Sequence, residues 1–459
     1  MSNQGNSDFK TCIFALMSVV NILFPVLFFL GIIILISRNK FFKKSPFSSI
    51  SLQFAFVIRA LSSLAVFYIY SEYYTVRGEA DTFKYFDDSH YMAQALWNHP
   101  LDYFQMLFGI NCDTNYFHEE YFNQMSNWVR SYDNGLFNDN RLIIRFNAFI
   151  RIFSFGNYHV HALVFNLIAF IGSVYIGKVF YTVSGSKLKS YFTVFLVPSL
   201  IFWSSGIFKE SILLFALGAF LYLFYQGSIG NWNRKKGLVL LFMAGILIVM
   251  KLYVFAAFLP ACICYYVARN QKRTSAIYIG LFTSFLILAC ALGAFKPELN
   301  FIELIVDKQR DFINLAHHFD VNSAFPMDYL QANLGSLLKA SPEAILNAFT
   351  KPWIGEVNSV LFIPPLFENI LLLFAVLLCF YWRKKLARLQ FKFILFCLVF
   401  TLVLYLIIGL TTPITGALVR YKIPAAPFIW ITVLMLLDTR QFPKYFTRNK
   451  LYKWLHTSL

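Results

Sequence analysis

The apolar segment FKFILFCLVFTLVLYLIIGLT, at positions 391–411, decides the fold class of this chain. Its one charged residue, Lys392, lies near its start. The segment is long enough to cross a membrane, since about 20 apolar residues span a hydrocarbon core of about 30 Å as an α-helix. The basic segment RKKLAR precedes it at positions 383–388. Apolar segments of this length joined by short basic turns are typical of a polytopic α-helical membrane protein.

The composition of the whole chain agrees with this interpretation. Of 459 residues, 58% are hydrophobic and 14% are charged, and the mean hydropathy is +0.59. A soluble domain carries about 25% charged residues. The net charge is +17, but most lysines and arginines lie in short turns, where they set topology and meet anionic lipid headgroups. We therefore expect membrane lipids, and no nucleic acid, among the partners.

The sequence predicts about eleven membrane-spanning helices and therefore an all-α protein. The predicted spans are residues 12–36, 49–70, 158–182, 191–207, 210–225, 237–251, 253–268, 276–295, 359–382, 391–411 and 423–438. Every second connection is basic, which places those connections and the C-terminus in the cytoplasm and the N-terminus outside. Residues 1–459 are expected to form a single transmembrane domain. The count depends most on two predicted hairpins, at 203–210 and 250–253.

Two long connections fall on the non-cytoplasmic face, at residues 71–157 and 296–358. The first ends in RLIIRFNAFIRIF, at 141–153, where apolar residues recur at helical spacing and three arginines share the other side. This pattern predicts an amphipathic helix in the outer membrane interface. The second connection also has helical periodicity, and Ser341-Pro-Glu predicts a helix start within it. The tail, 439–459, is predicted to be a cytoplasmic amphipathic segment on the inner surface.

Polar residues gather at the non-cytoplasmic ends of the predicted spans, where each costs free energy and needs an explanation. The catalytic candidates are Asp81 and Asp88, and the substrate-binding candidates are Lys209, Glu210, Lys251, Glu368, Arg420 and Lys422. Carboxylates beside cations suit a reaction in which a base activates an acceptor hydroxyl while cations stabilise a departing phosphate. Structural explanations stay open for single residues: a helix cap for Asp88, a local ion pair for Lys209, and a snorkelling side chain for Lys251.

Three segments resemble motifs of bacterial envelope-polysaccharide membrane proteins: GEADTFKY at 78–85, PSLIFWSSGIFKE at 198–210 and GALVRYKIP at 416–424. A many-span bundle whose first large outer loop begins with an acidic motif and ends in an interfacial helix also resembles the GT-C superfamily of membrane glycosyltransferases. In that superfamily the acidic loop usually follows the first span, whereas here it follows the second.

The resemblance implies a GT-C-like fold and an inverting sugar transfer at the extracytoplasmic face of a bacterial inner membrane. The donor would be a sugar linked to polyprenyl phosphate, and the acceptor a glycan, lipid or protein. Asp81 matches the acidic loop position and would be the base, and Asp87 and Asp88 are the competing candidates. Lys209 and Arg420 match basic positions that would hold the carrier phosphate.

Other functions stay open. An O-antigen-type polysaccharide polymerase would hold two carrier phosphates and depend less on a loop carboxylate. A transporter would be expected to show internal repeats and charges at mid-membrane depth, and we find no such repeats. A non-catalytic subunit of an envelope complex would tolerate substitution of Asp81. No metal site is predicted, because the adjacent His317 and His318 do not share a helix face. No cofactor is certain, and a divalent metal ion is the one left open.

Overall fold

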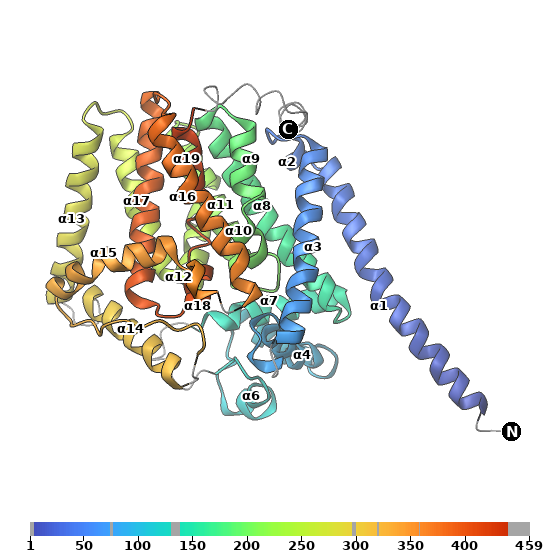
Figure 1. Cartoon of the computed structure of the whole chain (residues 1–459). Helices are drawn as coiled ribbons and strands as arrows, with labels where there is room; N and C mark the ends of the chain where they lie inside the picture. Colours follow the sequence, from blue (N-terminus) through green and yellow to red (C-terminus); the bar gives the residue numbers. More distant parts are fainter. Residues whose placement is uncertain are drawn as a thin grey trace. The chain divides into compact units, whose positions relative to one another are not determined.

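The computed structural model describes residues 4–73, 77–129, 138–295, 300–318, 321–357 and 359–438, the first of these ranges by its backbone alone up to residue 20. Within these ranges the protein is all-helical, as expected, and its β-structure is limited to two isolated bridges (Figure 1). The tail predicted at 439–459 lies outside the described residues.

Seven helices in the described ranges are long and apolar enough to cross a membrane. They are Asn21–Arg38, Ser49–Glu72, Tyr158–Ser184, Lys209–Ser228, Arg234–Ala268, Val360–Tyr381 and Arg388–Thr411. The bent pair Thr415–Tyr421 and Ala426–Leu436 adds an eighth if it crosses as one span. The chain thus has the apolar helices of a polytopic membrane protein.

The chain divides into two compact units. Unit 1 comprises Met1–Ile171 and Ser204–Phe215, and unit 2 comprises Gly172–Trp203 and Ala216–Leu459. Two long helices, α8 (Tyr158–Ser184) and α11 (Lys209–Ser228), contribute to both units.

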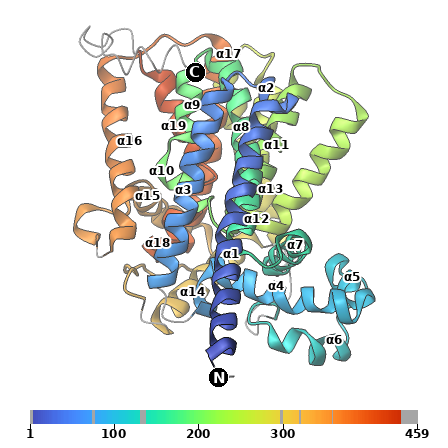
Figure 2. The same cartoon turned by 90° about the vertical axis from the view of Figure 1, so that its right-hand side faces the viewer.

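Unit 1 contains two long helices, α1 and α3, and a group of short helices. Its elements are α1 (Gln4–Arg38), α2 (Lys40–Lys43), α3 (Ser49–Tyr73), η1 (Arg77–Glu79), α4 (Asp81–Asn98), α5 (Pro100–Phe108), α6 (Asn115–Glu120), η2 (Phe122–Gln124) and α7 (Asp139–Ser154). Figure 2 shows α4 to α7 gathered at the end of α3 from which α4 follows. The side chain of Gln53 on α3 donates to the carbonyl of Ile33 on α1 at 3.2 Å.

The predicted amphipathic helix is present as α7, and its three arginines bind other parts of the same loop. Arg151 donates to the carbonyl oxygen of Phe86 at 2.6 Å and to Ser89 Oγ at 2.7 Å. The guanidinium carbons of Arg141 and Arg145 both lie 5.1 Å from the ring centre of Trp128. Burial lowers the pKa of Arg151 to about 10, so this side chain stays charged at neutral pH. The arginines of α7 are thus held by protein groups of the same loop.

Unit 2 is built around α17. Beyond its parts of α8 and α11, its elements are α9 (Lys187–Phe195), α10 (Pro198–Trp203), α12 (Arg234–Ala268), α13 (Thr274–Phe295), α14 (Phe301–His318), α15 (Leu334–Thr350), η4 (Ile354–Glu356), η5 (Val360–Phe362), α16 (Ile363–Tyr381), α17 (Arg388–Thr411), α18 (Thr415–Tyr421) and α19 (Ala426–Leu436). Phe258 of α12 contacts Phe396 and Phe400 of α17 and Phe428 of α19, with ring centres 4.9–6.0 Å apart. These rings form an aromatic core.

Several predicted spans are divided differently in the structure. Residues 191–207 form two short helices, α9 and α10, because Pro198 lacks the N–H that would continue α9. Residues 237–251 and 253–268 belong to α12, whose backbone leaves the helical region at Lys251 (φ −155°, ψ 88°), within the predicted hairpin. The helix start predicted at Ser341 is wrong, since α15 begins at Leu334 with Asn333 as its N-cap, and Pro342 lies inside it.

The basic turns of unit 2 meet one another at one end of its helices. Arg388 donates to the carbonyl of Gln271 at 2.9 Å, and Lys392 donates to the same carbonyl at 3.0 Å. Lys189 binds the carbonyls of Leu434 and Leu437, at 2.6 and 2.9 Å. The turns at 185–189, 269–273 and 383–388 therefore belong to the same end, as the alternation of basic connections predicts.

A close approach of two helices in unit 2 depends on Gly409. A Cβ atom at this position would lie 2.1 Å from the carbonyl oxygen of Ala344, so α17 and α15 touch here. We expect Gly409→Ala to lower the free energy of unfolding by about 1–3 kcal/mol, the usual cost of overpacking, measured by thermal unfolding in detergent. Gly245→Ala is the control, because its added Cβ meets nothing within 4 Å. Equal unfolding temperatures for the two variants would contradict the close approach.

Candidate functional site

Asp81, the predicted base, is the first residue of α4. A helix N-terminus favours negative charge, and the carboxylate also pairs with the ammonium group of Lys84, one turn later, at 2.5 Å. The side chains of Asp81 and Lys84 are 24% and 19% exposed. The carboxylate is therefore reachable by a substrate while its contact with water is limited.

Lys209, the predicted phosphate ligand of unit 1, begins α11 and pairs with Asp139, the first residue of α7. The distance from Lys209 Nζ to Asp139 Oδ2 is 2.6 Å, and the side chains are 9% and 18% exposed. Lys209 Nζ also lies 5.6 Å from the ring centre of Tyr85, and Lys84 Nζ lies 5.4 Å from the same ring. An ammonium group within about 6 Å of an aromatic ring is attracted to its face. The structure thus brings Lys209 and the Asp81–Lys84 pair together around Tyr85.

The segment before Lys209 is held in place by polar contacts within unit 1. Arg59, buried in α3, donates from Nη2 to the carbonyl oxygen of Ser204 at 2.6 Å and to its Oγ at 2.9 Å. The N–H of Ile207 donates to Thr82 Oγ1 on α4 at 3.3 Å. These bonds connect the segment that precedes α11 to α3 and α4. Lys209 therefore reaches the first turn of α4 although the two are far apart in the sequence.

Two further acidic candidates of unit 1, Asp88 and Glu210, are buried, with exposures of 2% and 1%. The two carboxylate oxygens of Asp88 accept from the backbone N–H groups of Ser126 and Asn127, at 3.0 and 2.8 Å. Burial raises the pKa of Asp88, and these hydrogen bonds counteract part of that shift. The contacts of Asp88 favour a structural role, in which it anchors the segment around Ser126. Glu210 follows Lys209 in the first turn of α11.

In unit 2, Glu368 of α16 is a buried carboxylate with polar neighbours. It accepts from the N–H of Ser199 at 3.0 Å and from Trp430 Nε1 at 3.3 Å. Glu368, Tyr405 and Lys422 line a small cavity of about 20 Å³, which has room for about one water molecule. This cavity is too small for a sugar or a phosphate, so Glu368 belongs to a packed polar centre.

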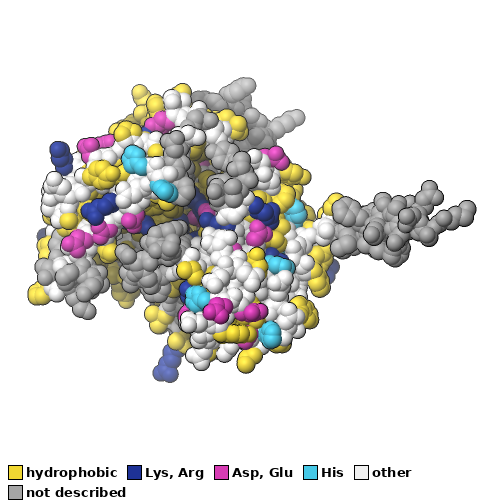
Figure 3. All heavy atoms as spheres, turned by 90° about the horizontal axis from the view of Figure 1, so that it is seen from below, with side chains coloured by type: hydrophobic (Ala, Val, Ile, Leu, Met, Phe, Trp, Pro, Cys, Tyr) yellow, Lys and Arg dark blue, Asp and Glu magenta, His cyan; other side chains and the backbone are white. Residues whose placement is uncertain are grey.

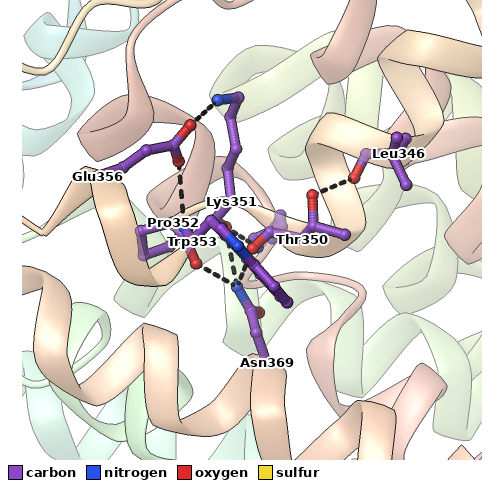
Figure 4. A network of polar contacts seen from close by, with 8 residues as sticks. Leu346, Thr350, Lys351, Pro352, Trp353, Glu356 and Asn369 are labelled. Carbon is purple, nitrogen blue, oxygen red and sulfur yellow. Dashed lines mark hydrogen bonds and ion pairs between the residues drawn. The ribbon is translucent and has the colours of Figure 1, made fainter.

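Lys422 lies where α18 and α19 meet, and it binds the end of α15. Its Nζ donates to the carbonyl oxygen of Lys351 at 2.9 Å. Asn369, next to Glu368 in the chain, donates to the carbonyls of Thr350 and Lys351, both at 3.0 Å, while the ammonium of Lys351 pairs with Glu356 (Figure 4). This network ties α15, α16 and the break between α18 and α19 together.

Lys251 and Arg420 place their cationic groups against aromatic rings of unit 2. Lys251, at the kink of α12, has its Nζ 4.4 Å from the ring of Tyr421, and the guanidinium carbon of Arg420 lies 5.8 Å from the ring of Trp203. Lys251 is 9% exposed, so its ammonium is held within the protein instead of snorkelling to lipid headgroups. Figure 3 shows one face of the molecule, on which basic, acidic and histidine side chains lie among apolar ones.

The sequence analysis did not predict Asp139 and Lys351 as partners in these polar contacts. Asp139 has a local signal, because Asn138 caps α7 with its side chain and an acidic residue often follows a cap. Lys351 has no such local signal in the sequence. It lies just after α15, and its partner Glu356 is not part of a motif. Among the described residues, no three His, Cys, Asp or Glu side chains are grouped as metal ligands.

Comparison of the chain with family models, with curated proteins and with solved structures finds no match in any of the three. The resemblance to the GT-C superfamily therefore depends on the short motifs and on the architecture alone.

Proposed function

We propose that this chain is a GT-C-like, inverting membrane glycosyltransferase. It would transfer a sugar from a polyprenyl-phosphate-linked donor to an envelope glycan, lipid or protein, at the extracytoplasmic face of a bacterial inner membrane. The observation that carries the proposal is the arrangement around Tyr85, where Asp81 and Lys84 of α4 lie with Lys209 of α11. A carboxylate and two ammonium groups next to an aromatic ring combine a proton acceptor, phosphate ligands and a surface for a sugar.

The proposed reaction uses these groups in one step. Asp81 accepts the proton of the acceptor hydroxyl as its oxygen bonds to the anomeric carbon of the donor sugar. The bond between that carbon and the phosphate oxygen breaks, and the released polyprenyl phosphate takes up the bonding electron pair. Lys84 and Lys209 stabilise the negative charge on the leaving phosphate. Attack from the face opposite the leaving group inverts the anomeric configuration.

A reconstitution assay tests the proposal. The purified chain, in nanodiscs, is incubated with a panel of polyprenyl-phosphate hexoses and a membrane glycan extract, and the products are followed by mass spectrometry. We expect release of free polyprenyl phosphate together with a glycan heavier by one hexose. Protein that unfolds cooperatively but consumes no donor of the panel would contradict the proposal.

A polysaccharide polymerase is the second candidate, and one observation favours it. Unit 2 has its own cations on aromatic rings, Lys251 and Arg420, and a polymerase must hold the phosphates of two carriers. The two functions differ in their dependence on Asp81. Loss of polymer in Arg420→Ala together with normal activity in Asp81→Asn would favour the polymerase.

The orientation of the chain is a separate prediction. The proposal places the loop 71–157 outside and the basic turns inside. In a cysteine-free background, we expect an impermeant maleimide to label Glu119→Cys in intact cells and to label Lys235→Cys and Lys272→Cys only after permeabilisation. All three side chains are exposed. The reverse pattern would overturn the orientation and move the site to the cytoplasm.

A further inference from the structure

A groove of about 420 Å³ lies in unit 2, between α15 and the segment that precedes it. One wall is the segment from Met327 to Asn333, and the other is the face of α15 that carries Lys339, Glu343 and Asn347. Its volume falls within the range of about 300–1,000 Å³ that is usual for ligand sites.

The first wall is fixed by Gln309 of α14. This side chain is 1% exposed, and it donates to the carbonyl of Asp328 at 3.1 Å and accepts from the N–H of Leu330 at 2.8 Å. The nitrogen and the oxygen of the buried Gln309 amide thus both bind the backbone of this segment. At its far end, Asn333 caps α15 through a 2.8 Å bond from the N–H of Ser336. The groove therefore has a preformed shape.

Four charged or amide side chains that line the groove, unlike Gln309 and Asn333, have no polar partner in the part of the chain that the structure describes. In the ranges that the structure describes, Asp328, Lys339, Glu343 and Asn347 make no side-chain hydrogen bond or ion pair, although Lys339 and Glu343 are four residues apart on one helix. Tyr329 is 60% exposed and makes no ring contact in those ranges. Beside the hydrogen-bonded amides of Gln309, Gln331 and Asn333, the groove thus presents two carboxylates, one ammonium group, one amide and one aromatic ring that make no such contacts.

We propose that this groove binds a neutral oligosaccharide segment. Two carboxylates against one ammonium group disfavour a phosphate or another anion. Carboxylate and amide oxygens accept from sugar hydroxyls, while the ammonium and amide N–H groups donate to them. The exposed face of Tyr329 offers a flat surface for a sugar ring.

The role of this oligosaccharide as the acceptor of the reaction rests on the proposed function. Binding itself does not depend on the reaction, so the two can be tested separately.

Binding is measured by saturation-transfer NMR and calorimetry on the full chain in nanodiscs, with maltoheptaose, cellohexaose, chitohexaose and mannohexaose as probes. We expect at least one probe to bind. Tyr329→Ala and Asn347→Leu should each weaken it at least tenfold, and Tyr329→Phe should retain binding because it keeps the ring face. Leu338→Ala and Leu346→Ala are the controls, since both side chains lie on α15, are 60% exposed and are outside the groove lining.

Three results would overturn the groove assignment: no probe binds, the two groove variants bind as well as the unmodified chain, or hexamers of galacturonic acid bind more tightly than the neutral probes. The transfer assay then separates the two proposals. Binding that is lost in Tyr329→Ala, with no transfer by the unmodified chain, would retain the groove and reject the glycosyltransferase. If both proposals hold, Tyr329→Ala raises the KM for the acceptor at least tenfold with little change in kcat.

Discussion

Asp81→Asn is expected to lower the proposed rate of sugar transfer by about 10²–10⁴-fold, the usual cost of losing a general base. The substitution keeps the size of the side chain and most of its hydrogen bonding, but the amide cannot accept a proton. The Asp81–Lys84 pair is partly exposed, and such pairs contribute little to stability. The rate is measured as polyprenyl phosphate released per folded protein in nanodiscs, with the unfolding temperature recorded for the same sample.

Asp88→Asn is the matched control, because it makes the same chemical change seven residues later on the same helix. It removes an acceptor from the backbone N–H groups of Ser126 and Asn127, so we expect a lower unfolding temperature and nearly normal activity per folded molecule. An active Asp81→Asn with an inactive but stable Asp88→Asn would move the base to Asp88. Normal activity in both variants would favour the polymerase or a non-catalytic subunit.

Lys209→Met is expected to lower the transfer rate by about 10²–10³-fold, as the loss of one group that stabilises transition-state charge usually does. It also leaves Asp139 without its ammonium partner at a site where both side chains are largely buried. Removing one partner of a buried ion pair costs about 3–5 kcal/mol, so a lower unfolding temperature accompanies the loss of activity. Lys209→Arg should restore part of the rate, since it keeps the charge but not the shape of the ammonium group.

The double variant Lys209→Met with Asp139→Asn separates catalysis from folding. Without the unpaired carboxylate, its unfolding temperature should return towards that of the unmodified chain, while its activity stays low. Recovery of both stability and activity would show that Lys209 serves only to hold α11 against α7, and phosphate binding would then have to be sought among the cations of unit 2.

The helices of this chain follow closely from its sequence, except where helices break. The predicted spans 49–70, 158–182 and 391–411 match α3, α8 and α17 within a few residues, because about 20 consecutive apolar residues are a local property. Breaks are harder to predict. Pro198 divides a predicted span into two short helices, whereas Pro342 lies inside α15. Whether a proline ends a helix depends on how neighbouring segments hold its backbone.

Composition and the position of basic residues alone determined that this is an all-α chain with apolar helices long enough for a membrane, since hydropathy is read residue by residue. The sequence also singled out Asp81 and Lys209, because they are polar residues at the non-cytoplasmic ends of predicted spans. Only the tertiary structure decided that Lys209 pairs with Asp139 beside Tyr85, that Asp88 is occupied by two backbone N–H groups, and that Gln309 shapes a groove. Each of these contacts joins residues far apart in the chain, and their approach depends on the packing of α4, α7, α11, α14 and α15, which no local pattern encodes.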